Sequence, residues 1–386
     1  MIIKSLLDQD FYKFTMGQVV LHQFPDFWVR YAFKCRTPSV EWTPEMVREI
    51  EREIGEFCTL GFTVEELEFL RSIRFLKKYF IDFLSLYRPS TRHVRVKYDG
   101  DLSIEVEGPW FLTIFFEVPV LAIVNEVYFR HTADFGRIES EGKKKLDGKI
   151  RIAETEGFRF SEFGTRRRFS FEWQSYVIDQ LHNRLPAKIY TGTSNVYFAK
   201  RCGKTPIGTM AHEFIQAGQA VNEVTLAHSQ RYMLQKWVDE YRGDLGIALS
   251  DTLGLEKFLI DFDLYFAKLY DGVRHDSGDP VEWAERMITH YESLRIDPRT
   301  KSFVFSDALD FETATMLWRT FSGRTNVAFG IGTNLTNDFP GVQPLNIVMK
   351  LAECNGKPVA KISDNPGKTM CDNDGFLSYL RDVIKK

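Results

Sequence analysis

The segment 271–280, DGVRHDSGDP, concentrates side chains that could hold a sugar phosphate. Its polar residues are Arg274, His275, Asp276, Ser277 and Asp279. Carboxylates can accept hydrogen bonds from ribose hydroxyls, and a guanidinium group binds phosphate oxygens. The segment also ends in a helix-start signal, because Asp279 can cap a helix whose first residue is Pro280. An ordinary capped turn with its charges in water fits the pattern equally well, so both interpretations stay open.

The segment 160–168, FSEFGTRRR, places an aromatic ring, Phe163, beside three consecutive arginines. Arginine binds carboxylates and phosphates through two parallel hydrogen bonds, and a nearby ring can stack on a planar substrate. Three consecutive arginines cannot all point the same way. We expect Arg166 to point inward and at least one of the others to lie at the surface. A basic, solvated loop is the alternative.

Two further clusters carry weaker signals. In PIGTMAHEF (206–214), His212 stands beside Glu213; it could act as a base, donate to a pyrophosphate or accept a phosphate. A lone histidine is more often structural. In FGIGTNL (329–335), Gly332 and Thr333 could offer backbone N–H groups to a phosphate, as late loops of barrels often do. This motif is unspecific by itself.

Composition limits the class of protein that carries these clusters. The chain has 386 residues, 44% hydrophobic and 27% charged, which is typical of a soluble globular protein of two or three domains. Its net charge of −3 provides no polybasic surface, so we expect no nucleic-acid partner. We find no apolar run near the roughly 20 residues that span a membrane, and expect no membrane association. Five cysteines without a C-x-x-C pair and a start without a signal-peptide profile indicate a cytoplasmic protein.

The first third of the sequence predicts a small α+β unit. We expect a helix over residues 1–20, a strand at 27–35, and helices opening after Thr43 and Thr63. Asp-Gly between the runs 93–98 and 102–106 predicts a hairpin. A long apolar helix follows from about 119 to 135, and then a charged, solvated helical segment.

From residue 158 onward, short apolar strands alternate with helical stretches. The predicted strands are Phe158–Glu162, Lys188–Tyr190, Ile207–Met210, Leu245–Leu249, Phe266–Tyr270, Phe303–Phe305, Val327–Phe329 and Ile347–Met349. This alternation indicates a parallel sheet with crossover helices. Polar clusters follow many of these strands, and such loops meet at one face of a (β/α) barrel, whereas only a few meet in an open sheet. We therefore favour a barrel. No G-x-G-x-x-G or P-loop motif is present.

Together these clusters resemble the nicotinate phosphoribosyltransferase family. The resemblance runs through the motifs DQDFYKFTM, EFGTRRRFS, GTSN, PIGTMAHEF, VRHDSGDP, FSDALD, FGIGTNL and KISDNPGK, and so covers nearly the whole chain. It implies an α/β fold of the type II class: an irregular TIM-like barrel with an N-terminal α+β domain, working as a homodimer with shared active sites. We expect the N-terminal domain over residues 1–115, joined by the C-terminal segment 355–386, and the barrel over 116–354.

The resemblance also implies a reaction. Nicotinate and phosphoribosyl pyrophosphate would give nicotinate mononucleotide and pyrophosphate for NAD salvage, with Mg²⁺. ATP hydrolysis would be coupled through a phosphorylated histidine, which His212 matches. No protein residue is expected to hold the metal, which would be bound mainly through pyrophosphate.

The implied substrate contacts come from several segments. Phe163 and Tyr12, the latter donated across the dimer interface, would sandwich the pyridine ring, and Arg166 would meet the substrate carboxylate. Asp276 would hold ribose hydroxyls and Arg274 the phosphate side. The remaining implied contacts are Thr165, and Ser306, Asp307, Gly332 and Thr333 around the 5-phosphate.

Four alternatives stay open. A nicotinamide-preferring relative is the nearest, and a quinolinate phosphoribosyltransferase would share the barrel type. An aldolase or isomerase barrel would need a Schiff-base lysine or a paired acid and base, and neither is evident. A metabolite-binding barrel without catalysis is the fourth. The main interpretation requires Phe163, His212 and Asp276 to meet at a single opening.

Overall fold

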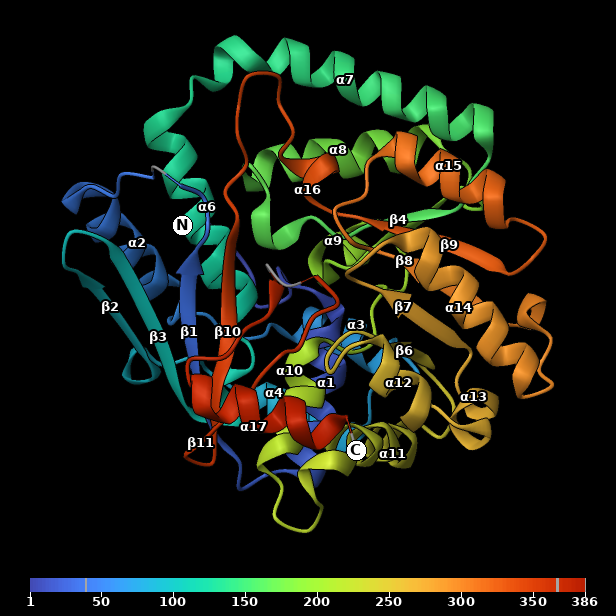
Figure 1. Ribbon diagram of the computed structural model, residues 1–386. Helices are drawn as coiled ribbons and strands as arrows, with labels where there is room; N and C mark the ends of the chain where they lie inside the picture. Colours follow the sequence, from blue (N-terminus) through green and yellow to red (C-terminus); the bar gives the residue numbers. More distant parts are fainter. Residues whose placement is uncertain (39, 366–367, 386) are drawn as a thin grey trace.

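Two β-sheets organise the chain in the computed structural model, which describes residues 1–38, 40–365 and 368–385 (Figure 1). The strand order is β11-β10-β1-β3-β2 in the first sheet and β5-β4-β9-β8-β7-β6 in the second. Pro366 and Gly367 of the KISDNPGK motif lie outside the described residues. The expectation of a mixed α/β fold with an N-terminal sheet and a parallel sheet is confirmed.

The first sheet is antiparallel throughout. Its strands are β1 (Trp28–Cys35), β2 (Val94–Tyr98), β3 (Leu102–Pro109), β10 (Ile347–Cys354) and β11 (Lys357–Pro358). The predicted hairpin is confirmed, and its turn uses Gly100 at φ +75°, a conformation that favours glycine.

Helices α2 (Pro44–Phe57), α3 (Val64–Ser72) and α4 (Lys78–Leu86) belong to the same N-terminal region. The predicted caps are confirmed, because Thr43 accepts from the Met46 N–H and Thr63 forms a capping box with Glu66. The helix predicted from residue 1 begins later, at α1 (Phe11–Gln23), because Asp10 is held in a β-bridge to Asn195.

An apolar stretch, α5 (Trp110–Thr113) with α6 (Glu117–Thr132), lies against the first sheet and α2. The expectation that no apolar run approaches membrane-spanning length is wrong, because Trp110–Thr132 is long and apolar enough. However, 89% of its most apolar window is buried within the protein, which is typical of a core helix. The charged segment that follows is helical as predicted, in α7 (Phe135–Glu156).

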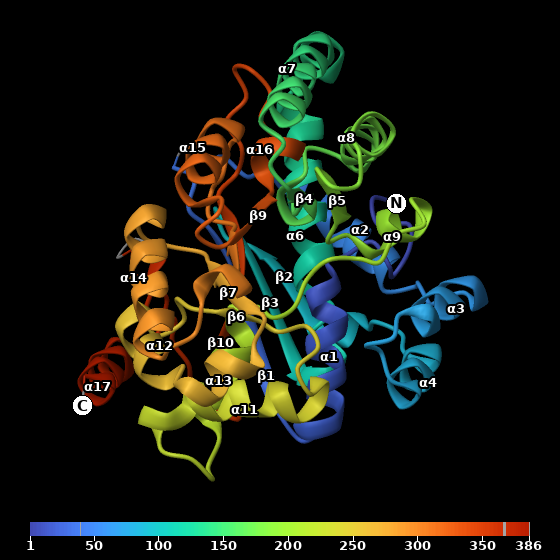
Figure 2. The ribbon, with the colours of Figure 1, turned by 90° about the vertical axis from the view of Figure 1, so that its right-hand side faces the viewer.

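The second sheet is parallel. Its strands are β4 (Phe160–Glu162), β5 (Tyr190–Thr193), β6 (Ile247–Leu249), β7 (Gly272–His275), β8 (Ser302–Phe305) and β9 (Asn326–Ile331). The helices between and after them are α8 (Phe171–Arg184), α9 (Val196–Arg201), α10 (His212–Ala217), α11 (Ser229–Tyr241), α12 (Leu255–Asp261), α13 (Leu264–Leu269), α14 (Pro280–Ser293), α15 (Phe311–Phe321), α16 (Thr333–Thr336) and α17 (Asp374–Ile384). In the turned view of Figure 2, α14 and α17 lie on the opposite side of the molecule from α3 and α4.

Three predicted strands differ from the structure. Residues 266–269 lie in helix α13, which Asp263 caps, and the strand starts only at Gly272. That strand requires glycine at its first position, because a Cβ at Gly272 would lie 1.9 Å from the carbonyl oxygen of Ser302. The predicted strand at 347–349 exists, as part of β10, but it pairs antiparallel with β1 and belongs to the first sheet.

The predicted strand 207–210 forms no regular ladder, although it lies between the two edge strands of the parallel sheet. The Ile207 N–H donates to the Thr193 carbonyl of β5 at 3.0 Å. The Thr209 hydroxyl donates to the Ile247 carbonyl of β6 at 3.0 Å. Pro206 has no N–H to donate, and Gly208 adopts φ +152°, so this segment bridges β5 and β6 irregularly.

Candidate active site

Polar side chains meet where the parallel strands end. His212 opens α10, and its Nε2 lies 2.7 Å from Oδ1 of Asp251 and 3.6 Å from Oδ2 of Asp276. Asp251 follows β6 and Asp276 follows β7 directly. The structure therefore brings His212 and Asp276 together, and it adds Asp251, which the sequence analysis missed. Asp251 carries the same signal as the other residues, a polar side chain just after an apolar strand.

Asp251 orients the histidine. Its carboxylate is buried and also accepts from Ser277 Oγ at 2.7 Å, with Lys361 Nζ at 2.8 Å. Burial alone would raise the pKa of Asp251, but His212 and Lys361 hold it well below its ordinary value. Burial lowers the pKa of His212. The ionised carboxylate therefore accepts a hydrogen bond from the Nε2–H of a neutral imidazole, and the lone pair of that ring lies on Nδ1.

Asp276 faces the histidine from the loop after β7. Ser306 Oγ donates to its Oδ1 at 2.8 Å. Burial raises the pKa of Asp276, whereas Arg274 and His212 lower it, and the net direction is downward, so the group is a carboxylate. Arg274 donates to the Met210 carbonyl at 3.2 Å and so fixes the chain just before His212.

The other predicted residues of these loops have separate partners. Asp307 forms an ion pair with Lys368. His275 contacts the Gly278 carbonyl at 3.2 Å, and Asp279 caps α14 through the Glu282 N–H, as expected. His275 and Asp279 are therefore structural.

His212, Asp251 and Asp276 could also hold a cation, because their ligand atoms all lie within 4.8 Å of one another. Mg²⁺ prefers oxygen ligands and keeps several of its waters. Both oxygens of Asp251 already have partners in His212, Ser277 and Lys361, which leaves Oδ2 of Asp276 as the more available ligand. The donor set fits Mg²⁺ bound through one carboxylate and a substrate, in addition to the expected binding through pyrophosphate.

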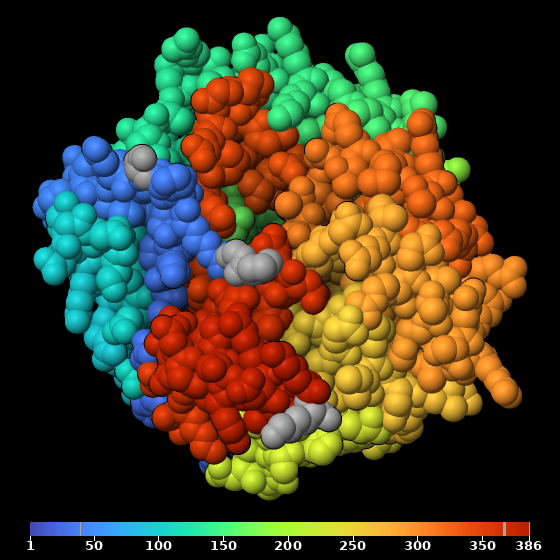
Figure 3. All heavy atoms as spheres, in the orientation of Figure 1, coloured from blue at the N-terminus to red at the C-terminus, as the bar shows by residue number. Residues whose placement is uncertain are grey.

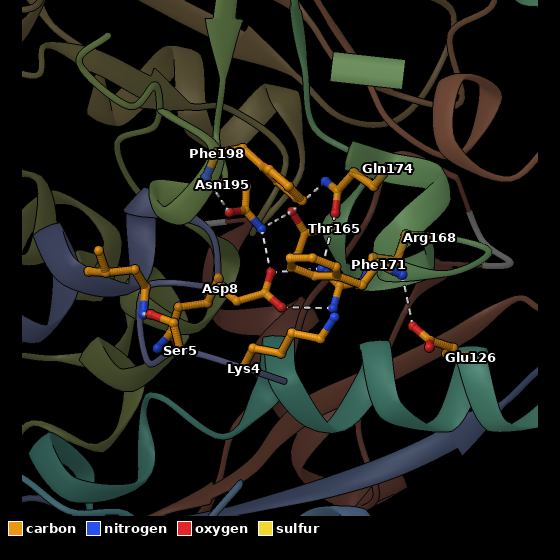
Figure 4. A network of polar contacts seen from close by, with 12 residues as sticks. Lys4, Ser5, Asp8, Glu126, Thr165, Arg168, Phe171, Gln174, Asn195 and Phe198 are labelled. Atoms are coloured by element: carbon orange, nitrogen blue, oxygen red, sulfur yellow. Dashed lines mark hydrogen bonds and ion pairs between the residues drawn. The ribbon is translucent and has the colours of Figure 1, made fainter. Parts of the chain in front are cut away.

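The three consecutive arginines of the loop after β4 have different environments. Arg168 is fully buried and forms a two-point ion pair with Asp8 at 2.7 and 2.8 Å (Figure 4). Arg167 donates to the Ile347 carbonyl at 3.0 Å. Arg166 is the most exposed, with 46% of its side chain accessible, and its Nη1 lies 3.4 Å from Glu117. The expectation that Arg166 is the inward arginine is wrong in terms of burial, since Arg168 fills that place.

Thr165 is buried in the same network. Gln174 and Asn195 donate to its hydroxyl at 3.1 and 3.2 Å (Figure 4). Glu162, at the end of β4, accepts from Gln174 and from the Gly164 N–H. Thr165 therefore supports the loop from within, and the contact with substrate predicted for it stays a prediction.

Phe163 lies on the glycine-rich turn after β9. A Cβ at Gly330 would come within 2.3 Å of its ring, and one at Gly332 within 3.0 Å of its carbonyl oxygen. The Phe163 N–H also donates to the Ile331 carbonyl at 2.8 Å. Gly330 and Gly332 thus leave the space that Phe163 occupies. The phosphate-binding role predicted for Gly332 and Thr333 stays a prediction.

Tyr12 lies beside Arg166 of its own chain. The Arg166 guanidinium is 5.9 Å and the Lys13 ammonium 5.5 Å from the centre of its ring. The expectation that Tyr12 is donated across a dimer interface concerns a second chain, and it stays a prediction. Its buried hydroxyl has no hydrogen-bond partner among the described residues.

Cations gather near these loops. Burial, helped by Arg36 and Lys34, lowers the pKa of Lys350 to about 8. Burial also lowers the pKa of Arg167 to about 10, helped by Arg166 and Arg36. Within residues 1–38, 40–365 and 368–385, no carboxylate forms an ion pair with Lys350 or Arg36. Figure 3 shows a hollow where blue N-terminal, orange and red C-terminal segments meet, with green segments at its floor. Cations that form no ion pair with a carboxylate suit a polyanion.

Comparison with known proteins agrees with this arrangement. The profile described as the nicotinate phosphoribosyltransferase (NAPRTase) family matches residues 158–386, and that of its N-terminal domain matches residues 7–125. The nicotinate phosphoribosyltransferase of Cupriavidus necator is 54% identical, covering 99% of this chain and 98% of the relative. That of Ralstonia pickettii is 53% identical, covering 100% and 99%.

Solved structures are similar over the same length. The nicotinate phosphoribosyltransferase of Vibrio cholerae superposes with a TM-score of 0.93 at 40% identity, covering 100% of this chain and 94% of that one. That of Porphyromonas gingivalis gives a TM-score of 0.92 at 35% identity, covering 99% and 100%. With matches of this identity along its whole length, the chain belongs to the nicotinate phosphoribosyltransferase family.

Proposed function

We propose that this enzyme of NAD biosynthesis joins nicotinate to phosphoribosyl pyrophosphate, giving nicotinate mononucleotide and pyrophosphate, with ATP hydrolysis coupled through His212. The observation that carries the coupling is the geometry of His212, which Asp251 holds as a neutral ring within 3.6 Å of Asp276. The family membership supports the overall reaction.

The reaction needs little acid or base catalysis from the protein. The pyridine nitrogen has a free lone pair, so its attack on the anomeric carbon needs no general base. The enzyme must orient two reactants and stabilise the departing pyrophosphate beside a cation-like sugar. Asp276 would hold ribose hydroxyls and Arg274 the phosphate side, while Ser306, Asp307, Gly332 and Thr333 would surround the 5-phosphate. Mg²⁺ would neutralise pyrophosphate charge, held mainly by that ligand and by Asp276.

Phosphoryl transfer to the enzyme would use the Nδ1 atom of His212. The bond between the γ-phosphorus and its bridging oxygen breaks, ADP leaves, and a phosphorus–nitrogen bond forms. Water later hydrolyses the phosphohistidine to phosphate. The added −1.5 to −2 charges would lie beside the diphosphate site and alter its affinity for pyrophosphate. The cations Arg36, Lys350 and Arg167 are the groups available to neutralise the polyphosphate.

The experiment is a rate assay with purified protein. Nicotinate mononucleotide formation is measured with and without ATP, in the parent enzyme and in His212→Ala. We expect the variant to lose the ATP-dependent stimulation but keep a slow turnover without ATP. ATPase activity persisting unchanged in His212→Ala would rule out this residue as the acceptor. A parent enzyme that binds nicotinate without converting it would indicate the non-catalytic alternative.

The nearest alternative substrate is the amide. Phe163 and Tyr12 would sandwich the pyridine ring, and Arg166 would meet the substrate carboxylate. A guanidinium favours a carboxylate over an uncharged amide, and one competition assay between nicotinate and nicotinamide distinguishes the two functions.

Three broader features belong to the same proposal. We infer that the parallel strands close into an irregular TIM-like barrel, with segment 207–210 filling the gap between β5 and β6. The domains would be 1–115 with 355–386, and 116–354. A homodimer in the cytoplasm would be the working form, with shared active sites to which Tyr12 is donated across the interface; light scattering on the purified enzyme tests the dimer.

A further inference from the structure

A buried lysine lies between carboxylates from two different helices. Lys13, on α1, is fully buried, and its Nζ lies 2.6 Å from Oε2 of Glu117 and 2.7 Å from Oε1 of Glu213. Glu117 is the first residue of α6, and Glu213 is the second residue of α10. Burying three charges is costly and is weak evidence for a role in stability.

This triad of charges connects Arg166, the proposed contact of the substrate carboxylate, with His212, the proposed phosphoryl acceptor. The second oxygen of Glu117, Oε1, lies 3.4 Å from Nη1 of Arg166. At the other end, Glu213 directly follows His212 on α10. The charges thus alternate from Arg166 through Glu117 and Lys13 to Glu213, and end one residue from His212.

The two carboxylates differ in how firmly they are held. Burial raises the pKa of Glu213, and Lys13 only partly offsets this. Burial raises the pKa of Glu117 too, but Lys13 and Arg166 together bring it below its ordinary value. Glu117 lies between two cations, whereas Glu213 has an ion pair with Lys13 alone among the described residues. Any change that moves Lys13 or Arg166 away from Glu117 therefore alters the ion pair between Lys13 and Glu213.

We propose that Lys13, Glu117 and Glu213 are positioning residues that couple the phosphorylation state of His212 to the hold of Arg166 on the acid substrate. The inference rests on the proposed function. A phosphoryl group on His212 would add about −1.5 to −2 charges one residue before Glu213 on α10, and this negative charge would compete with Glu213 for Lys13. A substrate carboxylate competes with Glu117 for Arg166. In a water-poor interior these competing attractions are strong, and the coupling they produce is reciprocal.

The test measures this coupling directly. The ratio of kcat/KM for nicotinate with ATP to that without ATP is determined in the parent enzyme, in Glu117→Gln and in Glu213→Gln. Both variants keep side-chain volume and hydrogen bonding but remove one charge. We expect each single variant to bring the ratio at least about tenfold closer to 1. The double variant should change the ratio little beyond the single variants, because the effects of interacting sites are non-additive. In parallel, the amount of phosphohistidine formed from γ-labelled ATP is measured with and without nicotinate. The effect of nicotinate on this amount is expected to be reduced in the variants by the same factor as the kcat/KM ratio.

Asp261→Asn is the matched control, because Asp261 forms a buried ion pair with Lys257 within α12, outside the triad. It should lower the melting temperature without changing the ratio. If the nicotinate KM of Glu117→Gln rises equally with and without ATP, Glu117 only supports Arg166 locally and the coupling is refuted. Should Glu117→Gln not fold, Glu213→Gln tests the same link from its other end. A parent enzyme that forms no nicotinate mononucleotide or no phosphohistidine refutes the proposed function instead.

Discussion

Individual side chains show that adjacent residues of one motif take separate tasks. Arg166, Arg167 and Arg168 are neighbours in sequence, yet one faces Glu117 and Tyr12, one holds the Ile347 carbonyl, and one is buried against Asp8. The motif predicted that the three side chains would not all point the same way, and this is confirmed. It could not say which guanidinium remains available, because that depends on a carboxylate from residue 8 and on the other packed elements.

Arg166→Ala should weaken binding of the acid substrate selectively. The guanidinium is half exposed, so loss of a charge-assisted pair with nicotinate should cost about 1.5–3 kcal/mol, or roughly 10- to 150-fold in kcat/KM. The amide should be affected little, so the preference for nicotinate over nicotinamide falls by the same factor. Competition assays at fixed phosphoribosyl pyrophosphate measure it. An unchanged nicotinate KM would assign the carboxylate contact to another residue.

Glu162→Gln should change how stability depends on pH. Burial raises the pKa of Glu162 from 4.5 to about 7, despite hydrogen bonds from Thr193 and Gly164 that lower it. The folded state thus favours the protonated acid, so this contribution to stability is complete below pH 4.5 and is lost as pH rises through 7. Its size is about 3 kcal/mol. Urea unfolding at pH 5 and pH 8 should show that loss in the parent and not in the variant; parallel curves would contradict the assignment.

Among the elements, features that depend on neighbouring residues were predicted well, whereas the pairing of strands distant in sequence was not. The caps at Thr43, Thr63 and Asp279 depend on residues three positions apart, and each was found where the sequence indicated it. The segment 266–269 is apolar and aromatic, which is ambiguous between strand and helix, and the cap at Asp263 decides for helix. The partners of segment 347–354 could not be read from its own residues, because alternation of side chains is the same in parallel and antiparallel ladders.

Asp8→Asn should destabilise the loop that carries Arg166. Asp8 and Arg168 are both fully buried, and neutralising one partner leaves an uncompensated charge, at a cost of about 3–5 kcal/mol. The free energy of unfolding in urea measures it. Asp147→Asn is the control, because it breaks the exposed pair with Arg184 and should cost less than about 1 kcal/mol. An equal decrease in the free energy of unfolding in both variants would show that the buried ion pair stabilises the protein no more than the exposed one.

At the scale of the whole molecule, the two sheets share one interior. A single apolar cluster includes Val29 and Val106 of the first sheet together with Phe303 and Phe329 of the second. Composition predicted a globular protein with an ample core, and the strand-end clusters predicted that His212 and Asp276 would lie close together. Neither could predict that the halves would be packed through a common core, since this depends on β10 returning to β1.

Unfolding should therefore be a single transition. Because the cluster crosses both sheets, loss of either one exposes the other, and far-ultraviolet circular dichroism and tryptophan fluorescence should give the same melting temperature. A saturating mixture of phosphoribosyl pyrophosphate and Mg²⁺ should raise that temperature in one step, with about 2.7 kcal/mol of stabilisation at a hundredfold excess over Kd. Two separate transitions would show that residues 1–115 and 116–354 behave as independent units.

The position of β10 has a consequence for biosynthesis. β1 ends at Cys35, but its neighbour in the sheet starts more than 300 residues later, at Ile347. A ribosome adding ~5–20 residues per second needs about 15–60 s to cover that distance. During this interval one edge of β1 has no final partner, and the nascent chain exposes an unpaired strand to other chains. Chaperones that bind emerging polypeptides should therefore affect the yield of this enzyme more than its activity.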